Sequence, residues 1–311
     1  MNKPEFFEAK KTSKLFGLKK DFDFISSLYL NKKLPRVTMI SGNKGSGKST
    51  LINHFLFSIF DKNNYNREKN IFTESSLLYK QLQSDIFPNI IYINGSYFEK
   101  VKVEDIRNLK NKIYQSTILD KDRFIIFDDI ELFNINSLNA LLKTIEEPNK
   151  NNFFFLINNK TKKIVDTIKS RSLEIKIILN NRQRIKISND LLSFFKLKPV
   201  ISLEDSQLTP GNFIKFNYIF EEFDINLENG FIENLSLLLN LYKKYKDILF
   251  INIAFFLTNL YFKDLNDNDI SKKERTYEIK NVIFNNLNNF LLYNINQNAL
   301  INELNQIFKN E

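Results

Sequence analysis

The sequence predicts an α/β domain built on a mainly parallel sheet, followed by a region that is helical throughout. In the first half of the 311 residues, short apolar runs alternate with helical patterns, the order typical of strands joined by crossover helices. After about residue 178 the strand-like runs stop, and apolar residues then recur at helical spacing. We therefore expect three domains: an α/β domain (1–178), a small helical domain (179–226) and a C-terminal helical domain (227–311).

Five strands are expected in the first domain. Most are β-branched or aromatic and apolar at the centre, as strands buried on both faces of a parallel sheet should be. The last one alternates apolar and polar residues, which favours a place at the edge of the sheet. The predicted strands are Arg36–Ser41, Asn89–Asn94, Arg123–Phe127, Phe153–Ile157 and Leu173–Ile177.

The helical patterns are clearest in Ser137–Glu146, where leucine and isoleucine side chains recur on one face. Two further helices, Arg182–Phe195 and Gly211–Phe223, are expected around a loop at Leu208–Gly211. The stretch Lys62–Gln83 is polar and irregular, and it predicts an insertion over the surface.

Composition excludes several classes of protein. A hydrophobic share of 43% is typical of a folded globular chain rather than a disordered one. With no Cys and a single His, His54, the chain has no disulfide, no Cys-ligated zinc module and no multi-His metal centre. No signal peptide or membrane-spanning run is evident, so we expect a cytoplasmic protein with no membrane partner. The net charge of +9 fits a nucleic-acid partner, or merely abundant lysine.

A phosphate-binding loop is the strongest local signal. The pattern G-x-x-x-x-G-K-S follows a predicted strand and precedes the apolar helix Thr50–Phe60, the context that such a loop requires. Its glycines allow backbone N–H groups to approach phosphates, Lys48 would neutralise β- and γ-oxygens, and the Ser49 hydroxyl would bind Mg²⁺. The predicted ATP-binding residues are Gly42, Asn43, Lys44, Gly45, Ser46, Gly47, Lys48, Ser49 and Thr50.

A second acidic element ends the strand Arg123–Phe127. Asp128 is placed to hold Mg²⁺ together with Ser49, the Walker B role. Asp129 is the candidate for positioning the attacking water, but it is one methylene shorter than the Glu usual in hydrolysing proteins. That difference of about 1 Å predicts slow hydrolysis.

Three further segments carry a resemblance to a family. They are Asn139–Pro148 (NALLKTIEEP), the apolar run Phe153–Leu156, and Ser170-Arg171-Ser172. This run closely resembles the bacterial clamp-loader subunits of DNA polymerase III, whose pattern is N-A-L-L-K-x-L-E-E-P, an apolar strand, and S-R-C. Leu34-Pro35 and Val103–Arg107 match the family more weakly.

The resemblance implies a P-loop AAA+ module with strand order 5-1-4-3-2, a small helical lid and a C-terminal helical collar. It implies a five-membered ring with gamma/tau motor and delta subunits that places the sliding clamp on primed DNA. Arg171 matches the S-R-C arginine and would act in trans as an arginine finger on a neighbour's nucleotide. Asn158, at the end of the fourth strand, matches the family's polar γ-phosphate sensor, with a shift to Asn159 left open.

Within the family, the chain resembles the delta-prime subunit most. Its lid turn reads Thr209-Pro210-Gly211, like the S-P-G of delta-prime chains, and lacks the sensor arginine of motor subunits. We therefore expect an ATP-binding subunit of the polymerase holoenzyme with weak or no ATPase activity of its own. Two alternatives stay open: a hydrolysing gamma/tau-type ATPase, and a DNA-binding scaffold whose phosphate loop is vestigial.

Overall fold

The computed structural model describes residues 3–95, 121–146, 151–268, 273–293 and 296–309. They divide into two units, one formed by residues 3–196 and 208–214, the other by residues 197–207 and 215–311. The predicted three-domain division, with boundaries near 178 and 226, stays a prediction.

A parallel five-stranded sheet organises the larger unit. Its spatial order is β4-β5-β6-β1-β7, and every neighbouring pair runs parallel. Counted in chain order, this is strand order 5-1-4-3-2, as the resemblance implies, and the alternating last strand does lie at an edge. The strands are β1 (Val37–Ser41), β4 (Ile90–Asn94), β5 (Arg123–Asp128), β6 (Asn152–Asn158) and β7 (Leu173–Lys176).

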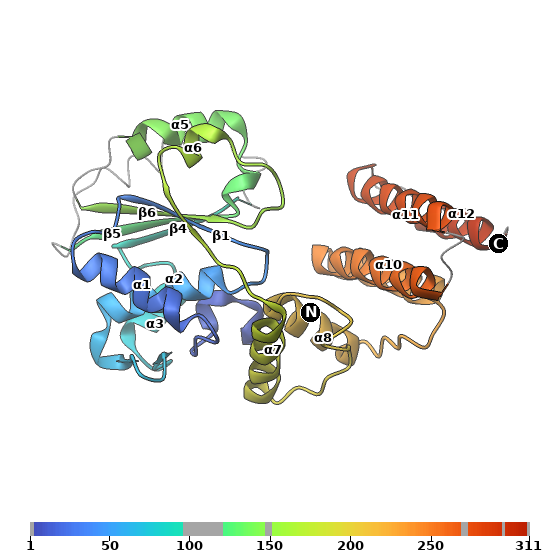
Figure 1. Cartoon of the computed structure of the whole chain (residues 1–311), viewed down its shortest axis with the longest axis horizontal. Coiled ribbons are helices and arrows are strands. Elements are labelled where there is room, and N and C mark those ends of the chain that lie inside the picture. The colour runs from blue at the N-terminus through green and yellow to red at the C-terminus, as the bar shows by residue number, and fades with distance from the viewer. Residues whose placement is uncertain (1–2, 96–120, 147–150, 269–272, 294–295, 310–311) are drawn as a thin grey trace. The chain divides into compact units, whose positions relative to one another are not determined.

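Helices cover both faces of this sheet (Figure 1). On one face lie α1 (Lys19–Leu30), α2 (Lys48–Phe60) and α3 (Leu77–Gln83), and on the other lie α5 (Ile135–Glu146) and α6 (Asp166–Lys169). Phe124 of β5 packs into the first layer, and Phe127 packs into the second. Because successive side chains of a strand point to opposite faces, a continuously apolar strand supplies both cores.

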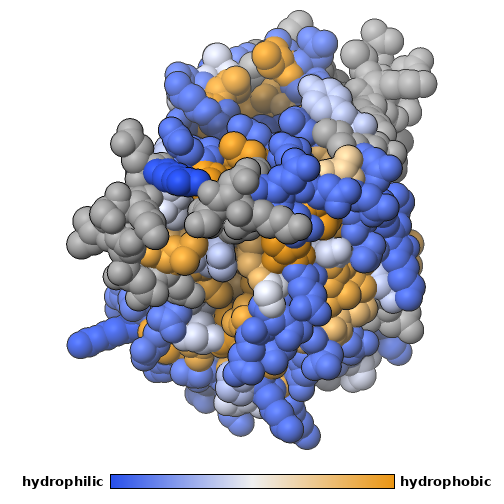
Figure 2. Space-filling model, turned by 90° about the vertical axis from the view of Figure 1, so that its right-hand side faces the viewer, coloured by the Kyte–Doolittle hydropathy of each residue, from blue (hydrophilic) through white to orange (hydrophobic). Residues whose placement is uncertain are grey.

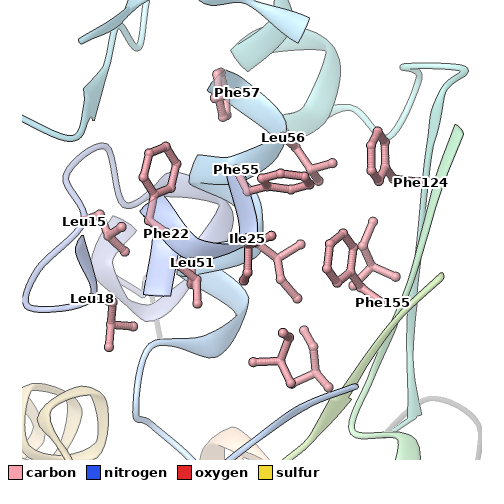
Figure 3. Close-up of a cluster of buried hydrophobic side chains, with 14 of the residues drawn as sticks. Leu15, Leu18, Phe22, Ile25, Leu51, Phe55, Leu56, Phe57, Phe124 and Phe155 are labelled. Carbon is pink, nitrogen blue, oxygen red and sulfur yellow. The ribbon is translucent and has the colours of Figure 1, made fainter. Parts of the chain in front are cut away.

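Aromatic rings dominate the core between the sheet and α1–α2 (Figure 3). Phe55 of α2 meets Phe124 and Phe155 of the sheet edge-on, with centroid distances of 5.7 and 5.5 Å. Phe22 and Ile25 of α1 close the cluster from the other side. Burial of each large side chain contributes about 2 kcal/mol or more. This layer holds α2, and with it the phosphate loop, firmly against the sheet.

The segment Lys62–Gln83, which the sequence predicts as a polar insertion over the surface, contains regular elements that its irregular pattern does not indicate. It contains η3 (Lys62–Asn64), the hairpin of β2 (Tyr65–Asn66) and β3 (Ile71–Phe72), and helix α3. Phe72 is 2% exposed and stacks on Phe57 of α2 at a centroid distance of 4.0 Å. A few buried rings therefore order a segment that is otherwise polar.

All the remaining elements in the described residues are helices. Three of them are single 3-10 turns: η1 (Glu5–Phe7) and η2 (Ala9–Lys11) near the N-terminus, and η5 (Ile130–Leu132) after β5. The two helices predicted after residue 178 are confirmed to within one residue at each end. The later helices form the all-α region. They are α7 (Asn181–Phe195), α8 (Pro210–Glu222), α9 (Phe231–Tyr245), α10 (Ile248–Asn268), α11 (Lys273–Tyr293) and α12 (Gln297–Lys309).

In the smaller unit, the side chain of Asn217 ties α8 to the preceding loop. Its amide donates to the carbonyl of Lys198 at 2.7 Å, and its oxygen accepts from the backbone N–H of Val200 at 2.7 Å.

Apolar side chains reach the surface in patches on the face drawn in Figure 2. Within the described ranges, no helix is long and apolar enough to cross a membrane.

Candidate nucleotide-binding site

The phosphate loop joins β1 to α2 in the conformation that its glycines permit. Gly45 and Gly47 have φ of +83° and +89°, in the left-handed region that glycine adopts at little cost. Gly47 also stands at the N-terminus of α2, which begins at Lys48. The partial positive charge of that helix end therefore faces the loop, an arrangement that favours a bound phosphate.

Lys48 lies inside the loop and is 2% exposed. Its ammonium group donates to the backbone carbonyls of Gly42 and Asn43, both at 2.8 Å. Burial lowers the pKa of Lys48 to about 8, while the nearby charges of Asp128 and Glu131 oppose that shift. The side chain is thus mostly charged at neutral pH and is held where a phosphate group would contact the loop.

The two predicted magnesium ligands meet. The Ser49 hydroxyl donates to Oδ2 of Asp128 at 2.9 Å. Burial raises the pKa of Asp128, and hydrogen bonds from Tyr92 and Ser49 oppose the rise. Hydroxyl and carboxylate oxygens are the ligands that Mg²⁺ prefers, usually with water and substrate phosphates completing the shell. Ser49 and Asp128 are therefore the residues that would hold a nucleotide-bound Mg²⁺, and in this structure they contact each other.

Asp129 follows directly, with a left-handed φ of +52°. Its Oδ1 accepts a hydrogen bond from the side-chain amide of Asn159 at 2.6 Å, and the Lys44 ammonium lies 3.8 Å away. Asn158 instead accepts from the backbone N–H of Lys160 at 2.9 Å. The polar residue that reaches the acidic pair is therefore Asn159, the neighbour that the sequence leaves open.

Two residues at this site were missed from the sequence. Tyr92 of β4 donates its hydroxyl to Oδ2 of Asp128. Glu131 is 6% exposed, and its Oε1 accepts from the backbone N–H of Asn159 at 3.0 Å and from the Thr161 hydroxyl at 2.8 Å. A tyrosine in a strand and a glutamate just after one carry no sequence signal of their own, because both are usual at such positions.

The turn that precedes α8 lies on the phosphate loop. The Thr209 hydroxyl donates to the carbonyl of Lys44 at 2.6 Å, and the backbone N–H of Gly211 donates to the carbonyl of Gly45 at 2.8 Å. A Cβ atom on Gly45 would lie 2.4 Å from the Thr209 hydroxyl oxygen. The contact therefore requires glycine at that position of the loop.

Arg171 lies just after α6, at the surface, and turns toward α5. Its Nε lies 2.7 Å from Oε1 of Glu146, and Nη1 donates to the carbonyl of Thr167 at 3.0 Å. These partners belong to α5 and α6 rather than to the phosphate loop. Two family-like stretches, Val103–Arg107 and Glu147–Pro148, lie outside the described residues.

Comparison with known proteins decides the family. The family model described as "DNA polymerase III, delta subunit" matches residues 18–180, more than half of the chain. The chain belongs to this family. These are the clamp-loader AAA+ proteins that the motifs of residues 34–172 resemble, and the matched range contains both the phosphate loop and Arg171.

Curated relatives carry two subunit names. The DNA polymerase III subunit gamma of Buchnera aphidicola subsp. Acyrthosiphon pisum is 26% identical over 255 residues, covering 79% of this chain and 67% of that protein. The subunit delta' of Pseudomonas aeruginosa is 29% identical over 94 residues, covering 30% of this chain and 29% of that protein. For the gamma subunit of Buchnera aphidicola subsp. Schizaphis graminum, the match spans 47% of the relative's length.

A solved structure of a DNA polymerase III gamma subunit-related protein from Thermotoga maritima aligns over 93% of this chain and 91% of that chain. Its sequence identity is 15% and its TM-score is 0.40, a likeness too low to bear on function.

Proposed function

We propose that this chain is a delta-prime-type subunit of the replicative clamp loader that binds ATP and hydrolyses it slowly or not at all. The observation that carries the proposal is the hydrogen bond from Ser49 to Asp128, beside the buried Lys48. It joins the phosphate loop to the Walker B strand at the point where a nucleotide-bound metal would lie. ATP supplies the charged phosphates that these residues would hold.

Slow hydrolysis is expected from the surroundings of Asp129. Its side chain is one methylene shorter than a glutamate, and its Oδ1 already accepts the amide of Asn159 at 2.6 Å. A carboxylate engaged in this way is poorly placed to orient a water on the γ-phosphate. Misplacement by about 1 Å costs on the order of a hundredfold in rate.

Arg171 would serve a neighbour. Its contacts lie on α5 and α6, at the surface. A second subunit could therefore bind the guanidinium by replacing Glu146 as its partner. In that role it would stabilise charge on the neighbour's γ-phosphate. Gamma/tau motor subunits, a delta subunit, the sliding clamp and primed DNA are the partners of this proposal.

A gamma-type hydrolysing subunit is the second candidate. It is favoured by the complete phosphate loop and by the gamma relative whose match covers 79% of this chain. The lid turn favours delta-prime, because Thr209-Pro210-Gly211 resembles the S-P-G of delta-prime chains and α8 contains no arginine.

The test combines nucleotide binding, single-turnover hydrolysis and stoichiometry. Fluorescent ATP should bind the unmodified chain and the exposed-lysine control Lys33→Ala equally, and Lys48→Ala should lose binding by at least about tenfold. Purified complexes analysed by native mass spectrometry should contain one copy beside several motor subunits. Several copies per complex with rapid hydrolysis would favour the gamma role, and no nucleotide binding would favour a vestigial loop.

A further inference from the structure

We propose that the Tyr92 hydroxyl occupies the position on Asp128 that a magnesium-bound water would use, so that this site binds nucleotide with little dependence on Mg²⁺. The inference rests on the proposed nucleotide binding and concerns how the metal takes part in it.

The carboxylate of Asp128 is crowded with donors. An ionised carboxylate offers about four acceptor positions, two on each oxygen. Oδ2 accepts from both the Ser49 hydroxyl, at 2.9 Å, and the Tyr92 hydroxyl. Oδ1 accepts the backbone N–H of Asp129 at 2.9 Å, and the amide of Asn159 lies at 3.4 Å. Little acceptor capacity is left for a further ligand.

The contact from Ser49 is compatible with a metal, because a hydroxyl that donates its hydrogen keeps lone pairs for a cation. The contact from Tyr92 competes with a metal, since it takes up a lone pair of the carboxylate that a metal or a metal-bound water would otherwise need. Mg²⁺ keeps several waters and gives them up reluctantly. A metal entering this site must therefore displace the phenol or do without the carboxylate.

Tyr92 is held in place by its surroundings. The Lys10 ammonium lies 4.8 Å from the centroid of its ring, and the backbone belongs to β4, which pairs with β5 along its whole length. The phenol therefore keeps its place beside Asp128.

Equilibrium binding of fluorescent ATP tests the inference on the full chain, in Mg²⁺ and in excess EDTA. In the unmodified chain, the affinities for ATP in Mg²⁺ and in EDTA should agree within about threefold. In Tyr92→Phe, the ratio of the affinity in Mg²⁺ to the affinity in EDTA should be about tenfold larger, which corresponds to one hydrogen bond to a charged group. Tyr29→Phe is the matched control, since it removes a phenol that donates to Asp122 at 2.8 Å, away from the loop.

The outcomes separate the two proposals. Equal strengthening by Mg²⁺ in the unmodified chain and in Tyr92→Phe would overturn this inference while leaving nucleotide binding intact. A strong dependence of ATP affinity on Mg²⁺ in the unmodified chain would by itself overturn the inference, so the test holds even if the variant fails to fold. Absence of binding under both conditions would overturn the proposed function and this inference together.

Discussion

Oε1 of Glu131 accepts the backbone N–H of Asn159 at 3.0 Å, which ties the end of β6 to the turn after β5. The same oxygen accepts the backbone N–H and the hydroxyl of Thr161, at 3.3 and 2.8 Å. Asn159 in turn donates to Asp129. The buried carboxylate of Glu131 therefore positions the polar residue that faces Asp128 and Asp129.

Replacing Glu131 with Ala should therefore lower the free energy of unfolding by about 2 kcal/mol, since buried donors lose their acceptor. Glu131→Gln is the matched control. It keeps one acceptor oxygen in the same place, and it should lose about half as much. Urea unfolding measures both. Equal losses for the two variants would mean that the acceptor oxygen contributes nothing, and the positioning role would fail.

The approach of the lid turn to the loop gives a second prediction. Ala at Gly45 would need a φ near +83° and would place its Cβ 2.9 Å from the backbone nitrogen of Asn212. Left-handed strain and overpacking together should cost about 3 kcal/mol of unfolding free energy. ATP affinity should fall as well, because the loop must move.

Gly230→Ala is the control for that substitution. A Cβ at Gly230 meets nothing within 4 Å, and its φ is −57°. Its cost should stay below about 1 kcal/mol. If urea unfolding gives the same loss for both variants, the close approach at Gly45 has no energetic consequence.

Much of this fold follows from the sequence because its strands are apolar without interruption. Such strands must be covered on both faces, and the helical periods between them supply the cover. The order around Phe72 does not follow from the sequence, because that segment is polar and has no regular period. Its order comes from packing against Phe57, a contact between positions 15 residues apart that local pattern does not contain.

Some residues of the site follow from the sequence in the same way, and others do not. Lys48, Ser49 and Asp128 were predicted because a loop between a strand and a helix fixes their chemistry locally. The roles of Tyr92 and Glu131 depend on which side chains the sheet brings to Asp128 and Asn159. These are distant in sequence, so only the folded chain identifies them.

Nucleotide binding should weaken at alkaline pH. Lys48 has its pKa lowered to about 8 by burial, so the free protein loses the charge above that value. A bound phosphate favours the charged form. Affinity should therefore be constant below about pH 8 and fall by up to about tenfold per pH unit above it. Titration calorimetry from pH 7 to pH 10 measures this, and Lys48→Ala should show a flat profile over the same range.

Stability should fall at acidic pH because of His54. The imidazole is fully buried, with Nε2 at 3.1 Å from the carbonyl of Thr12 and Nδ1 at 3.1 Å from the Tyr65 hydroxyl. Since a carbonyl only accepts, the proton lies on Nε2, and Tyr65 donates to Nδ1. Burial lowers the pKa of His54 from 6.5 to about 4, so the folded state keeps the ring neutral.

The unfolded chain binds a proton at His54 more readily than the folded protein does. The contribution of neutral His54 to the free energy of unfolding is therefore complete above pH 6.5. It is lost as the pH falls to about 4, by about 3 kcal/mol in total. Urea unfolding at a series of pH values should show this slope in the unmodified chain. His54→Gln, which can donate and accept in the same place, should lack it, and an unchanged slope in that variant would assign the acid sensitivity to other groups.

The last prediction separates the two readings of Arg171, a surface ion pair and an arginine finger. An exposed pair such as the one with Glu146 stabilises a protein by less than about 1 kcal/mol, so Arg171→Ala should barely change the unfolding of the isolated chain. In a complex with motor subunits, the same change should lower ATP hydrolysis by about a thousandfold at the neighbouring site alone.

Glu146→Gln completes the design, because it weakens the hold on Arg171 without removing the guanidinium. Hydrolysis at the neighbouring site should then be kept or raised, whereas loss of the ion pair as such would give the same result in both variants. Single-turnover measurements on the assembled complex distinguish these outcomes, since they report chemistry separately from nucleotide exchange.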